Sequence, residues 1–219
     1  MARLVIFGAG DIAKLAHYYF TRDSEHRVEA FIVDRVYRNS DTYLGLPLVD
    51  FEAVRVFYPP GQFKMFIALS YARMNRVRAG KYFQAKELGY ELVSYVSSRC
   101  TFLTESPVGD NCFILEDNTV QPFVRIGNNV TLWSGNHIGH DSIIEDHCFL
   151  ASHIVVSGHV HIHPYCFIGV NATLRNSITI APETLIGAGA VIMKNTVPKG
   201  VYAPEKTEAS RATSDRVEL

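Results

Sequence analysis

The 219-residue sequence has no long hydrophobic segment, because runs such as residues 65–69 are far too short to span a bilayer. It also lacks an excess of charge, since 21 Lys and Arg stand against 22 Asp and Glu. That balance gives no reason to expect a nucleic acid or an anionic membrane as a partner. The first residues enter a strand-like run at once, without the parts of a secretory signal, which favours a cytoplasmic protein.

Residues 1–95 have the pattern of alternating strands and helices. We expect strands over residues 4–7, 28–33 and 64–69, and helices over residues 11–21 and 72–88, with Gly89 as the stop signal. Residues 92–96 then lead out of this part. Strands separated by helices imply a small parallel sheet.

The second half follows a different period, with an aliphatic residue at every sixth position through fifteen hexads. The series is Val108, Ile114, Val120, Ile126, Leu132, Ile138, Ile144, Leu150, Val156, Ile162, Ile168, Leu174, Ile180, Ile186 and Ile192, and Val96 and Phe102 extend it backwards. If the chain returns above its start after three hexads, each aliphatic residue stacks on its counterpart at a strand spacing of about 4.8 Å. The period therefore predicts a parallel β-helix, since an ordinary β-sandwich alternates with period two.

The fifth place of the hexad holds mostly small or β-branched residues, and all four cysteines, Cys100, Cys112, Cys148 and Cys166, stand there. This regularity indicates inward packing rather than nucleophiles or metal ligands. Cys148 and Cys166 would lie on adjacent coils, where geometry permits a disulfide, but we expect reduced thiols in a cytoplasmic protein. Glycine often follows the aliphatic residue, where we expect it to allow tight corners.

The hexad repeat resembles that of the hexapeptide-repeat acyltransferases, which implies a left-handed helix. Together with the runs Val5-Ile-Phe-Gly-Ala-Gly10 and Ile138-Gly-His-Asp141, nearly the whole chain looks like bacterial sugar acetyltransferases. These are related to sialic-acid O-acetyltransferases and nucleotide-amino-sugar N-acetyltransferases. The resemblance implies a Rossmann-like nucleotide-sugar-binding domain (α/β, residues 1–95), a left-handed parallel β-helix acyltransferase domain (96–204) and a C-terminal tail (205–219). It further implies a homotrimer with acetyl-CoA in the clefts between subunits.

Acyl transfer from a thioester needs a base for the acceptor's proton and a donor for the developing oxyanion. His140 occupies an outward corner place of its hexad and matches the family's catalytic histidine, and Asp141 matches the acidic residue beside it. Position 158 is 18 residues further on, so Gly158 should lie one coil from His140. In the resembling enzymes the N–H at this place stabilises the oxyanion. The same spacing stacks His159 beside Asp141, and the two side chains are predicted to compete.

Seven of the nine histidines lie between His137 and His163, but at different hexad places. We therefore expect them on different faces rather than in one cluster. The γ-class carbonic anhydrases share this coil and carry two histidines five residues apart, a spacing that is absent here, so no metal site is predicted. A metal-dependent hydratase and a non-catalytic scaffold remain the alternatives from other classes. His153 is a candidate for the acceptor cleft.

Gly8, Ala9 and Gly10 form a degenerate glycine-rich turn at a strand-to-helix junction, where exposed N–H groups favour phosphate. Asp34 ends the next strand and is suited to a ribose or a base. The resemblance implies that these residues, with Ser70 after the third strand, bind the acceptor's nucleotide and sugar. The turn continues as Asp11-Ile-Ala13 where the family has further glycine and histidine.

Acetyl-CoA, the one cosubstrate predicted, is assigned to Gly158, Gly187, Ala188 and Lys194, with Lys199 and Lys206 as further candidates for its phosphates. Residues 207–219 are predicted to be a loose tail. The sequence thus predicts an acetyl-CoA-dependent acetyltransferase of a nucleotide-linked amino sugar in surface-polysaccharide assembly. O-acetylation of a free sugar such as sialic acid is the alternative, since a histidine base serves both reactions.

Overall fold

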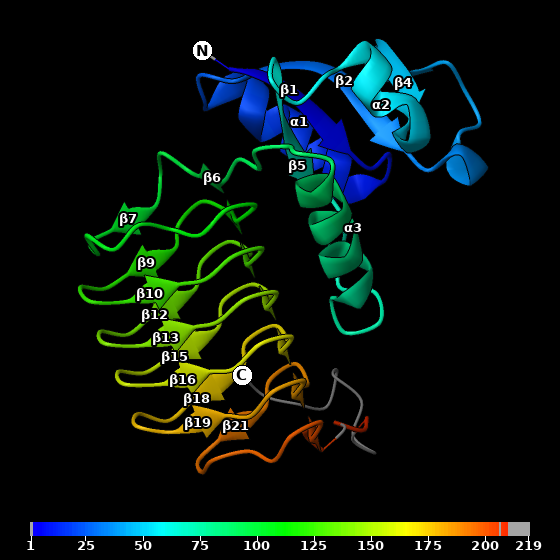
Figure 1. Ribbon diagram of the computed structural model, residues 1–219. Coiled ribbons are helices and arrows are strands. Elements are labelled where there is room, and N and C mark those ends of the chain that lie inside the picture. Colours follow the sequence, from blue (N-terminus) through cyan, green and yellow to red (C-terminus); the bar gives the residue numbers. More distant parts are fainter. Residues whose placement is uncertain (1, 206, 210–219) are drawn as a thin grey trace, which may run out of the picture.

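The structure is a computed structural model that describes residues 2–205 and 207–209. The predictions that Lys206 contacts the phosphates of CoA and that residues 210–219 form a loose tail concern residues outside this range. The chain has two parts, an α/β part over residues 3–87 and a stack of coils that begins at residue 95 (Figure 1).

The α/β part is built on one five-stranded sheet in the order β3-β4-β2-β1-β5, parallel except for the β3–β4 pair. Its elements are β1 (Arg3–Phe7), α1 (Asp11–Arg22), β2 (Arg27–Val33), η1 (Arg35–Tyr37), β3 (Thr42–Tyr43), β4 (Leu46–Asp50), η2 (Phe51–Ala53), α2 (Val54–Phe57), β5 (Phe63–Ile67) and α3 (Arg76–Glu87). Residues 4–7 of β1 are buried on both faces, as their continuous apolar run requires in a parallel sheet. The three predicted strands and both predicted helices are present, whereas the elements over residues 35–57 were not predicted.

The second helix begins later than predicted, at Arg76 instead of residue 72. The reason is local: Arg73, Met74 and Asn75 have left-handed φ values of 51°, 52° and 63°, which an α-helix does not accommodate. Asn75 is fully buried, and its Nδ2 donates to the carbonyl oxygen of Cys166 at 3.1 Å. The turn before α3 is therefore held by the coils, and α3 runs alongside them (Figure 1).

The coils consist of two-residue strands, and those from β8 to β21 each end on a residue of the predicted aliphatic series. They are β6 (Tyr95–Val96), β7 (Thr101–Phe102), β8 (Phe113–Ile114), β9 (Thr119–Val120), β10 (Arg125–Ile126), β11 (Thr131–Leu132), β12 (His137–Ile138), β13 (Ile143–Ile144), β14 (Phe149–Leu150), β15 (Val155–Val156), β16 (His161–Ile162), β17 (Phe167–Ile168), β18 (Thr173–Leu174), β19 (Thr179–Ile180), β20 (Leu185–Ile186), β21 (Val191–Ile192) and β22 (Val201–Tyr202). Val108 alone of the series lies outside a strand.

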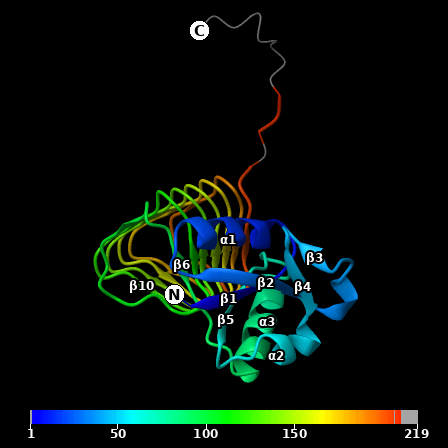
Figure 2. The same cartoon turned by 90° about the horizontal axis from the view of Figure 1, so that it is seen from above.

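The strands form three parallel sheets, with the orders β10-β13-β16-β19, β22-β20-β17-β14-β11-β8-β6 and β21-β18-β15-β12-β9-β7. Leu132 pairs with Leu150, and Ile144 with Ile162, which confirms the 18-residue coil. The first-place residues from Ile114 to Ile192 are at most 6% exposed and form the core. Figure 2, seen from above, shows the superposed coils beside the α/β part.

The four cysteines are free thiols, as predicted. Cys112, Cys148 and Cys166 are fully buried, and burial raises the pKa of the Cys112 thiol to about 12. They pack the inside of the coil.

The prediction that glycine at the second hexad place allows tight corners was wrong. Left-handed φ values occur at the fourth hexad place, as in Asp141 and His147, and not at Gly139 or the other glycines of the second place. A Cβ on Gly139 would instead lie 2.6 Å from the backbone nitrogen of Gly158 in the next coil. Glycine at this place permits close approach between coils rather than a tight corner.

The corners stack into three edges, each named here after one histidine. The His140 edge joins the six- and four-stranded sheets and comprises residues 121–123, 139–141, 157–159, 175–177 and 193–195. The His147 edge joins the four- and seven-stranded sheets over residues 109–111, 127–129, 145–147, 163–165 and 181–183. The His153 edge completes the prism over residues 115–117, 133–135, 151–153, 169–171 and 187–189.

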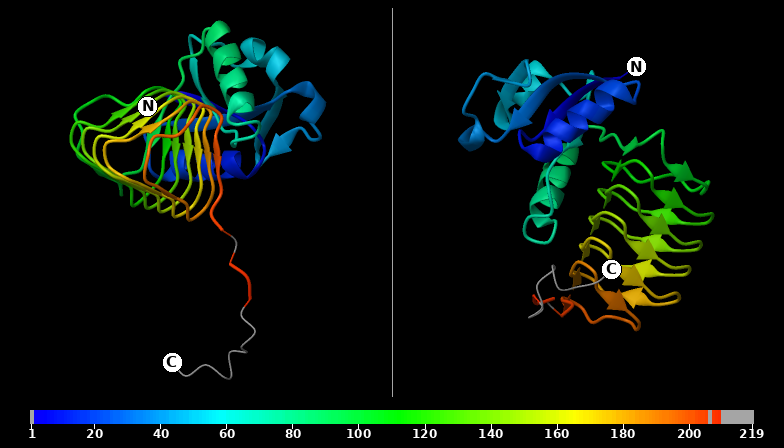
Figure 3. Two further views of the ribbon diagram at one scale, coloured as in Figure 1. Left: turned by 90° about the horizontal axis from the view of Figure 1, so that it is seen from below. Right: turned by 180° about the vertical axis from the view of Figure 1, so that it is seen from behind.

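The α/β part packs on the seven-stranded sheet and on the His147 edge. The Tyr71 ring lies 5.0 Å from that of Phe149 and 4.7 Å from that of Phe167, both on this sheet. From α3, Arg78 reaches Asn129 of the His147 edge. The His140 edge lies opposite the seven-stranded sheet and so faces away from the α/β part; Figure 3 shows the two parts from two further sides.

Candidate functional site

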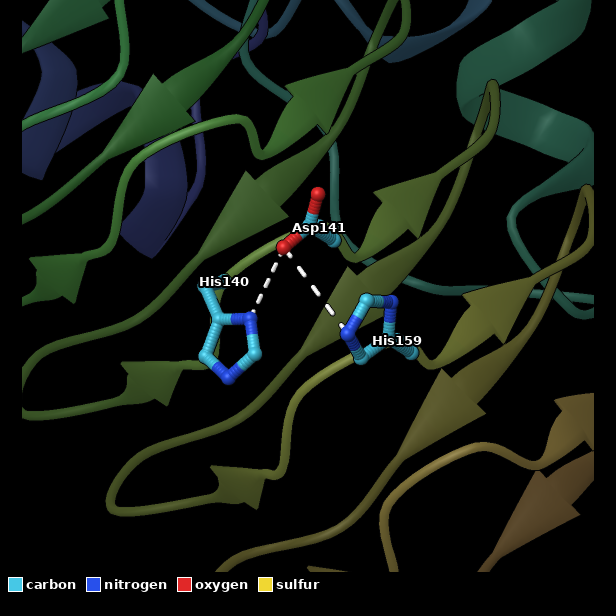
Figure 4. Close-up of side chains that lie close together, drawn as sticks. All are labelled: His140, Asp141 and His159. Carbon is cyan, nitrogen blue, oxygen red and sulfur yellow. Dashed lines mark hydrogen bonds and ion pairs between the residues drawn. The ribbon is translucent and has the colours of Figure 1, made fainter.

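His140 lies at the turn between β12 and β13, and 53% of its side chain is exposed. Its Nδ1 is 2.8 Å from Oδ2 of Asp141, and the same oxygen is 3.9 Å from Nε2 of His159 (Figure 4). The two imidazole rings are 5.0 Å apart and nearly perpendicular. Because Asp141 engages Nδ1, the Nε2 atom of His140 is the ring nitrogen that stays available to accept a proton.

Neighbouring coils fix the backbone of this turn. The His140 N–H donates to Oε1 of Gln121 at 2.9 Å, and its carbonyl oxygen accepts from the His159 N–H at 2.9 Å. Asp141 adopts a φ of 58°, which aspartate tolerates better than most residues. The backbone that carries the imidazole and the carboxylate is therefore fixed by hydrogen bonds to the neighbouring coils.

Gly158 lies directly against the free side of the His140 ring. A Cβ at position 158 would come within 2.7 Å of Nε2, so any other residue here would occupy the space in front of that atom. Among the described residues, no acceptor is found for the Gly158 N–H. The predicted stacking of positions 140 and 158 is confirmed, and it brings Nε2 of His140 close to the backbone of a residue whose N–H has no acceptor among the described residues.

The expectation that the histidines do not cluster was partly wrong. His161 and His163 stack at 4.2 Å between ring centroids, and both contact the Glu145 carboxylate. His140 and His159 form the other pair. Glu145 and His163 are 18 residues apart, so the coil places them on the same edge, and their spacing in the sequence could have predicted this contact. His147 shares its edge with His163, and His153 lies on the third edge.

The α/β part contains a cavity of about 390 Å³ at the ends of β1 and β2. Gly8, Ala9, Gly10 and Asp34 line it, as predicted for the nucleotide site, whereas Ser70 does not. A Cβ on Gly8 would lie 2.6 Å from the carbonyl oxygen of Ala68, and its φ is 127°, so glycine is required there. The Ser70 carbonyl accepts a hydrogen bond from Arg78 instead, at 3.5 Å.

Sequence reasoning missed several residues of this cavity. Lys81 of α3 forms an ion pair with Asp34 at the cavity wall and is only 16% exposed. Tyr37, Asn39 and Tyr43 come from the segment for which no structure had been predicted. A lysine within a helix carries no sequence signal of such a role; only the packing of α3 against β5 reveals it.

The residues predicted for acetyl-CoA are divided between two edges of one chain. Gly158 and Lys194 lie on the His140 edge, and Gly187 and Ala188 lie on the His153 edge. His153 belongs to the latter edge, where its Nδ1 would be 2.5 Å from a Cβ on Gly135. One chain alone does not bring these two sets together.

Within the described residues, no helix has the length and apolar character needed to cross a membrane.

Residues 108–140 and 123–158 match the family described as bacterial transferase hexapeptide repeats. Curated relatives include an acyl-[acyl-carrier-protein]–UDP-N-acetylglucosamine O-acyltransferase of Stutzerimonas stutzeri, 33% identical over 66 residues. The match covers 27% of this chain and 26% of that protein, so the chain spans about a quarter of the length of the relatives it matches.

Three solved structures share the fold over most of the chain. PerB from Caulobacter crescentus, in complex with CoA and GDP-perosamine, is 22% identical with a TM-score of 0.77, covering 93% of this chain and 92% of that one. The acetyltransferase domain of PglB from Neisseria gonorrhoeae, with acetyl coenzyme A, is 22% identical with a TM-score of 0.76 (90% and 93%). WeeI from Acinetobacter baumannii is 20% identical with a TM-score of 0.75 (92% and 94%). Residues 108–158 thus match bacterial transferase hexapeptide repeats, and the chain has the left-handed β-helix fold of these structures.

Proposed function

We propose that the protein is an acetyltransferase that moves the acetyl group of acetyl-CoA to the amine of a nucleotide-linked amino sugar. The observation that carries this proposal is the exposed imidazole of His140, which Asp141 holds through Nδ1 and whose Nε2 lies next to the Gly158 backbone. The similarity in fold to PerB, whose structure contains CoA and GDP-perosamine, supports the two substrate classes.

The transfer requires two proton movements, one from the acceptor amine to His140 and one from His140 to the thiolate of CoA. Neutral His140 takes a proton on Nε2 from the acceptor amine as its nitrogen forms a bond to the thioester carbon. The Gly158 N–H donates to the oxygen that becomes negative in the tetrahedral intermediate. When the C–S bond breaks, the thiolate of CoA takes the proton from His140, which leaves an amide, free CoA and a neutral imidazole.

Asp141 orients the imidazole through Nδ1 and stabilises the charge that the ring gains during the reaction. His159 lies on the far side of the same carboxylate oxygen. We assign His159 a positioning role. Its Nε2 lies 3.9 Å from Oδ2 of Asp141, whereas Nδ1 of His140 lies only 2.8 Å from the same oxygen.

The nucleotide is assigned to the cavity of the α/β part, which we interpret as a Rossmann-like domain over residues 1–95. The Gly8–Gly10 turn ends at the N-terminus of α1, where backbone N–H groups favour a phosphate. Asp34 lines the same cavity and is suited to a ribose. Lys81 also lines it and supplies a positive charge for the phosphates. Ser70 remains a candidate only for the outer part of the acceptor.

A homotrimer accounts for the separation of these sites. The nucleotide cavity belongs to the part that covers the seven-stranded sheet, whereas the His140 edge faces away from it. If the His153 edge of a neighbouring copy faces the His140 edge, then Gly187, Ala188 and His153 of one chain join Gly158 and Lys194 of another around acetyl-CoA. The assignment of residues 96–204 as the acyltransferase domain and a cytoplasmic location complete the proposal.

The proposal is tested by thiol release from acetyl-CoA against a panel of nucleotide amino sugars, nucleotide hydroxy sugars and free sugars that include sialic acid. We expect release with a nucleotide amino sugar and a stoichiometric N-acetyl product in mass spectrometry. Release only with a hydroxy sugar would instead assign O-acetylation. If no acceptor releases thiol and CoA gives no thermal stabilisation of the protein, the enzymatic assignment is wrong.

A further inference from the structure

Phe123 occupies a backbone conformation that phenylalanine rarely adopts. It stands at the fourth place of its hexad with a φ of 67°, and the residues of the His140 edge that share both this place and a positive φ are Asp141, His159 and Ser177. Such a φ is a genuine outlier for a bulky side chain and costs folding free energy. The Phe123 ring is also 72% exposed, and no aromatic or cationic partner is found for it among the described residues.

The other aromatic residue at this place, Tyr165 of the His147 edge, has an evident reason to be there. Its ring lies 4.8 Å from that of His147 and 5.1 Å from the Arg76 guanidinium. Phe123 has the same conformational cost without a comparable contact. Folding of the single chain therefore does not explain the phenylalanine.

The surroundings of Phe123 connect it to the candidate catalytic turn. Pro122 and Phe123 lie one coil before His140 and Asp141, and the Pro122 carbonyl oxygen accepts from the Asp141 N–H at 3.3 Å. A cavity of about 470 Å³ opens on this side, lined by Leu103, Thr104, Glu105, Ser106, Pro122 and Phe123. It combines an aromatic face with hydroxyl groups and one exposed carboxylate.

His140 divides its edge into two ends of opposite character. Towards the N-terminus lie Phe123 and the carboxylate of Glu105, and towards the C-terminus lie the exposed cations Arg175 and Lys194. The phosphates of CoA suit the basic end. An amino sugar suits the other end, because its C–H face packs on an aromatic ring and its ammonium group is attracted by the ring and by a carboxylate.

We propose that Phe123 and Glu105 form the subsite for the amino-sugar ring of the acceptor, one coil before His140. This inference rests on the proposed function for its substrate class. The Phe123 ring supports the apolar face of the sugar, and Glu105 holds the amine until it approaches Nε2 of His140. The strained φ is retained because only an aromatic side chain at this place supplies that face.

The experiment uses glucosamine as a probe, so that it does not depend on catalysis. Saturation-transfer NMR is recorded on the wild-type protein, on Phe123→Asn and Glu105→Gln, and on the control Phe83→Asn, whose ring is 48% exposed on α3. We expect transfer to the sugar ring protons in the wild type and the control, a loss of at least about fivefold in Phe123→Asn and a smaller loss in Glu105→Gln. Equal transfer in wild type and Phe123→Asn overturns the subsite.

A second measurement separates a binding role from a structural one. Asparagine tolerates a left-handed φ, so Phe123→Asn should raise the Tm by about 2–4 °C while weakening sugar binding. Light scattering is recorded on the same variant. A smaller assembly with unchanged sugar signals would make Phe123 an interface residue and would refute the inference. Binding of the probe without thiol release in the acceptor panel would refute the proposed function and leave the subsite intact.

Discussion

His140 and His147 lie on two edges of the same β-helix, one exposed and the other buried. The His140 side chain is 53% exposed and bonded through Nδ1 to a carboxylate. His147 is 4% exposed, its Nδ1 is 2.9 Å from Nδ2 of Asn129, and its ring lies 5.4 Å from that of Tyr82. Burial lowers the pKa of His147, so its neutral form is favoured in the fold. The repeat sets where a histidine lies, whereas the element packed on its edge sets its chemistry.

The difference between the edges comes from α3. Arg78 is 2% exposed and donates to Oδ1 and the carbonyl oxygen of Asn129 and to the carbonyl oxygen of Cys148, each at 3.1 Å. Burial lowers the pKa of Arg78 to about 10, so the guanidinium stays charged at neutral pH. One buried cation thus fastens α3 over the His147 edge, and no described part of the chain covers the His140 edge.

The first test changes the close approach of the His140 ring to Gly158. Gly158→Ala places a methyl group where the thioester is proposed to lie, and we expect turnover to fall about 100-fold. Stability should change little, because the exposed His140 ring can move aside. The matched control is Asn176→Ala, one coil further along the same edge, which should retain the wild-type rate. Equal rates in both variants would remove Gly158 from the mechanism.

The second test loosens the covered edge. Arg78→Ala leaves the buried Asn129 carbonyl oxygen without its donor and removes one of two donors to the Cys148 carbonyl oxygen, and we expect the free energy of unfolding to fall by about 3 kcal/mol in denaturant titration. Arg76→Ala is the control, since the Arg76–Glu183 pair is exposed and should contribute less than about 1 kcal/mol. Similar losses in the two variants would show that Arg78 does not fasten α3.

The third and smallest effect is a pH dependence that belongs to the covered edge. Because the folded-state pKa of His147 is lowered, the unfolded chain binds more protons as the pH falls below about 6.5. The wild type should therefore lose unfolding free energy between about pH 6.5 and 5, in part also through the half-buried His17 and His26, whose pKa values are lowered by desolvation.

The test of this dependence is the His147→Asn variant. It should show a shallower slope of unfolding free energy against pH than the wild type, since His17 and His26 still contribute. An unchanged slope would contradict the assignment to His147.

Much of the coil was predictable because its period is local and unbroken. The aliphatic series located every strand from β8 to β21, and the 18-residue coil placed Gly158 against His140. The proposed subsite at Phe123 escaped prediction, because its exposure and positive φ have no signature in the sequence.

The α/β part was less predictable. The start of α3 depends on three left-handed residues that the coils hold in place, and Lys81 reaches Asp34 only through tertiary packing. Residues 35–57 form short elements whose apolar pattern is too brief to identify, such as the two-residue strand β3. Local pattern is sufficient for a repeat, whereas the cavity of the α/β part is assembled by long-range contacts.

The central claim is that the exposed histidine, and not the buried one, carries the reaction. Its most direct test compares thiol release from acetyl-CoA by His140→Ala and His147→Asn at saturating acceptor, with CoA affinity measured by calorimetry. The account predicts that His140→Ala lowers turnover by roughly 10²–10⁴ with nearly unchanged CoA affinity, while His147→Asn retains activity. Near-normal turnover in His140→Ala would contradict it.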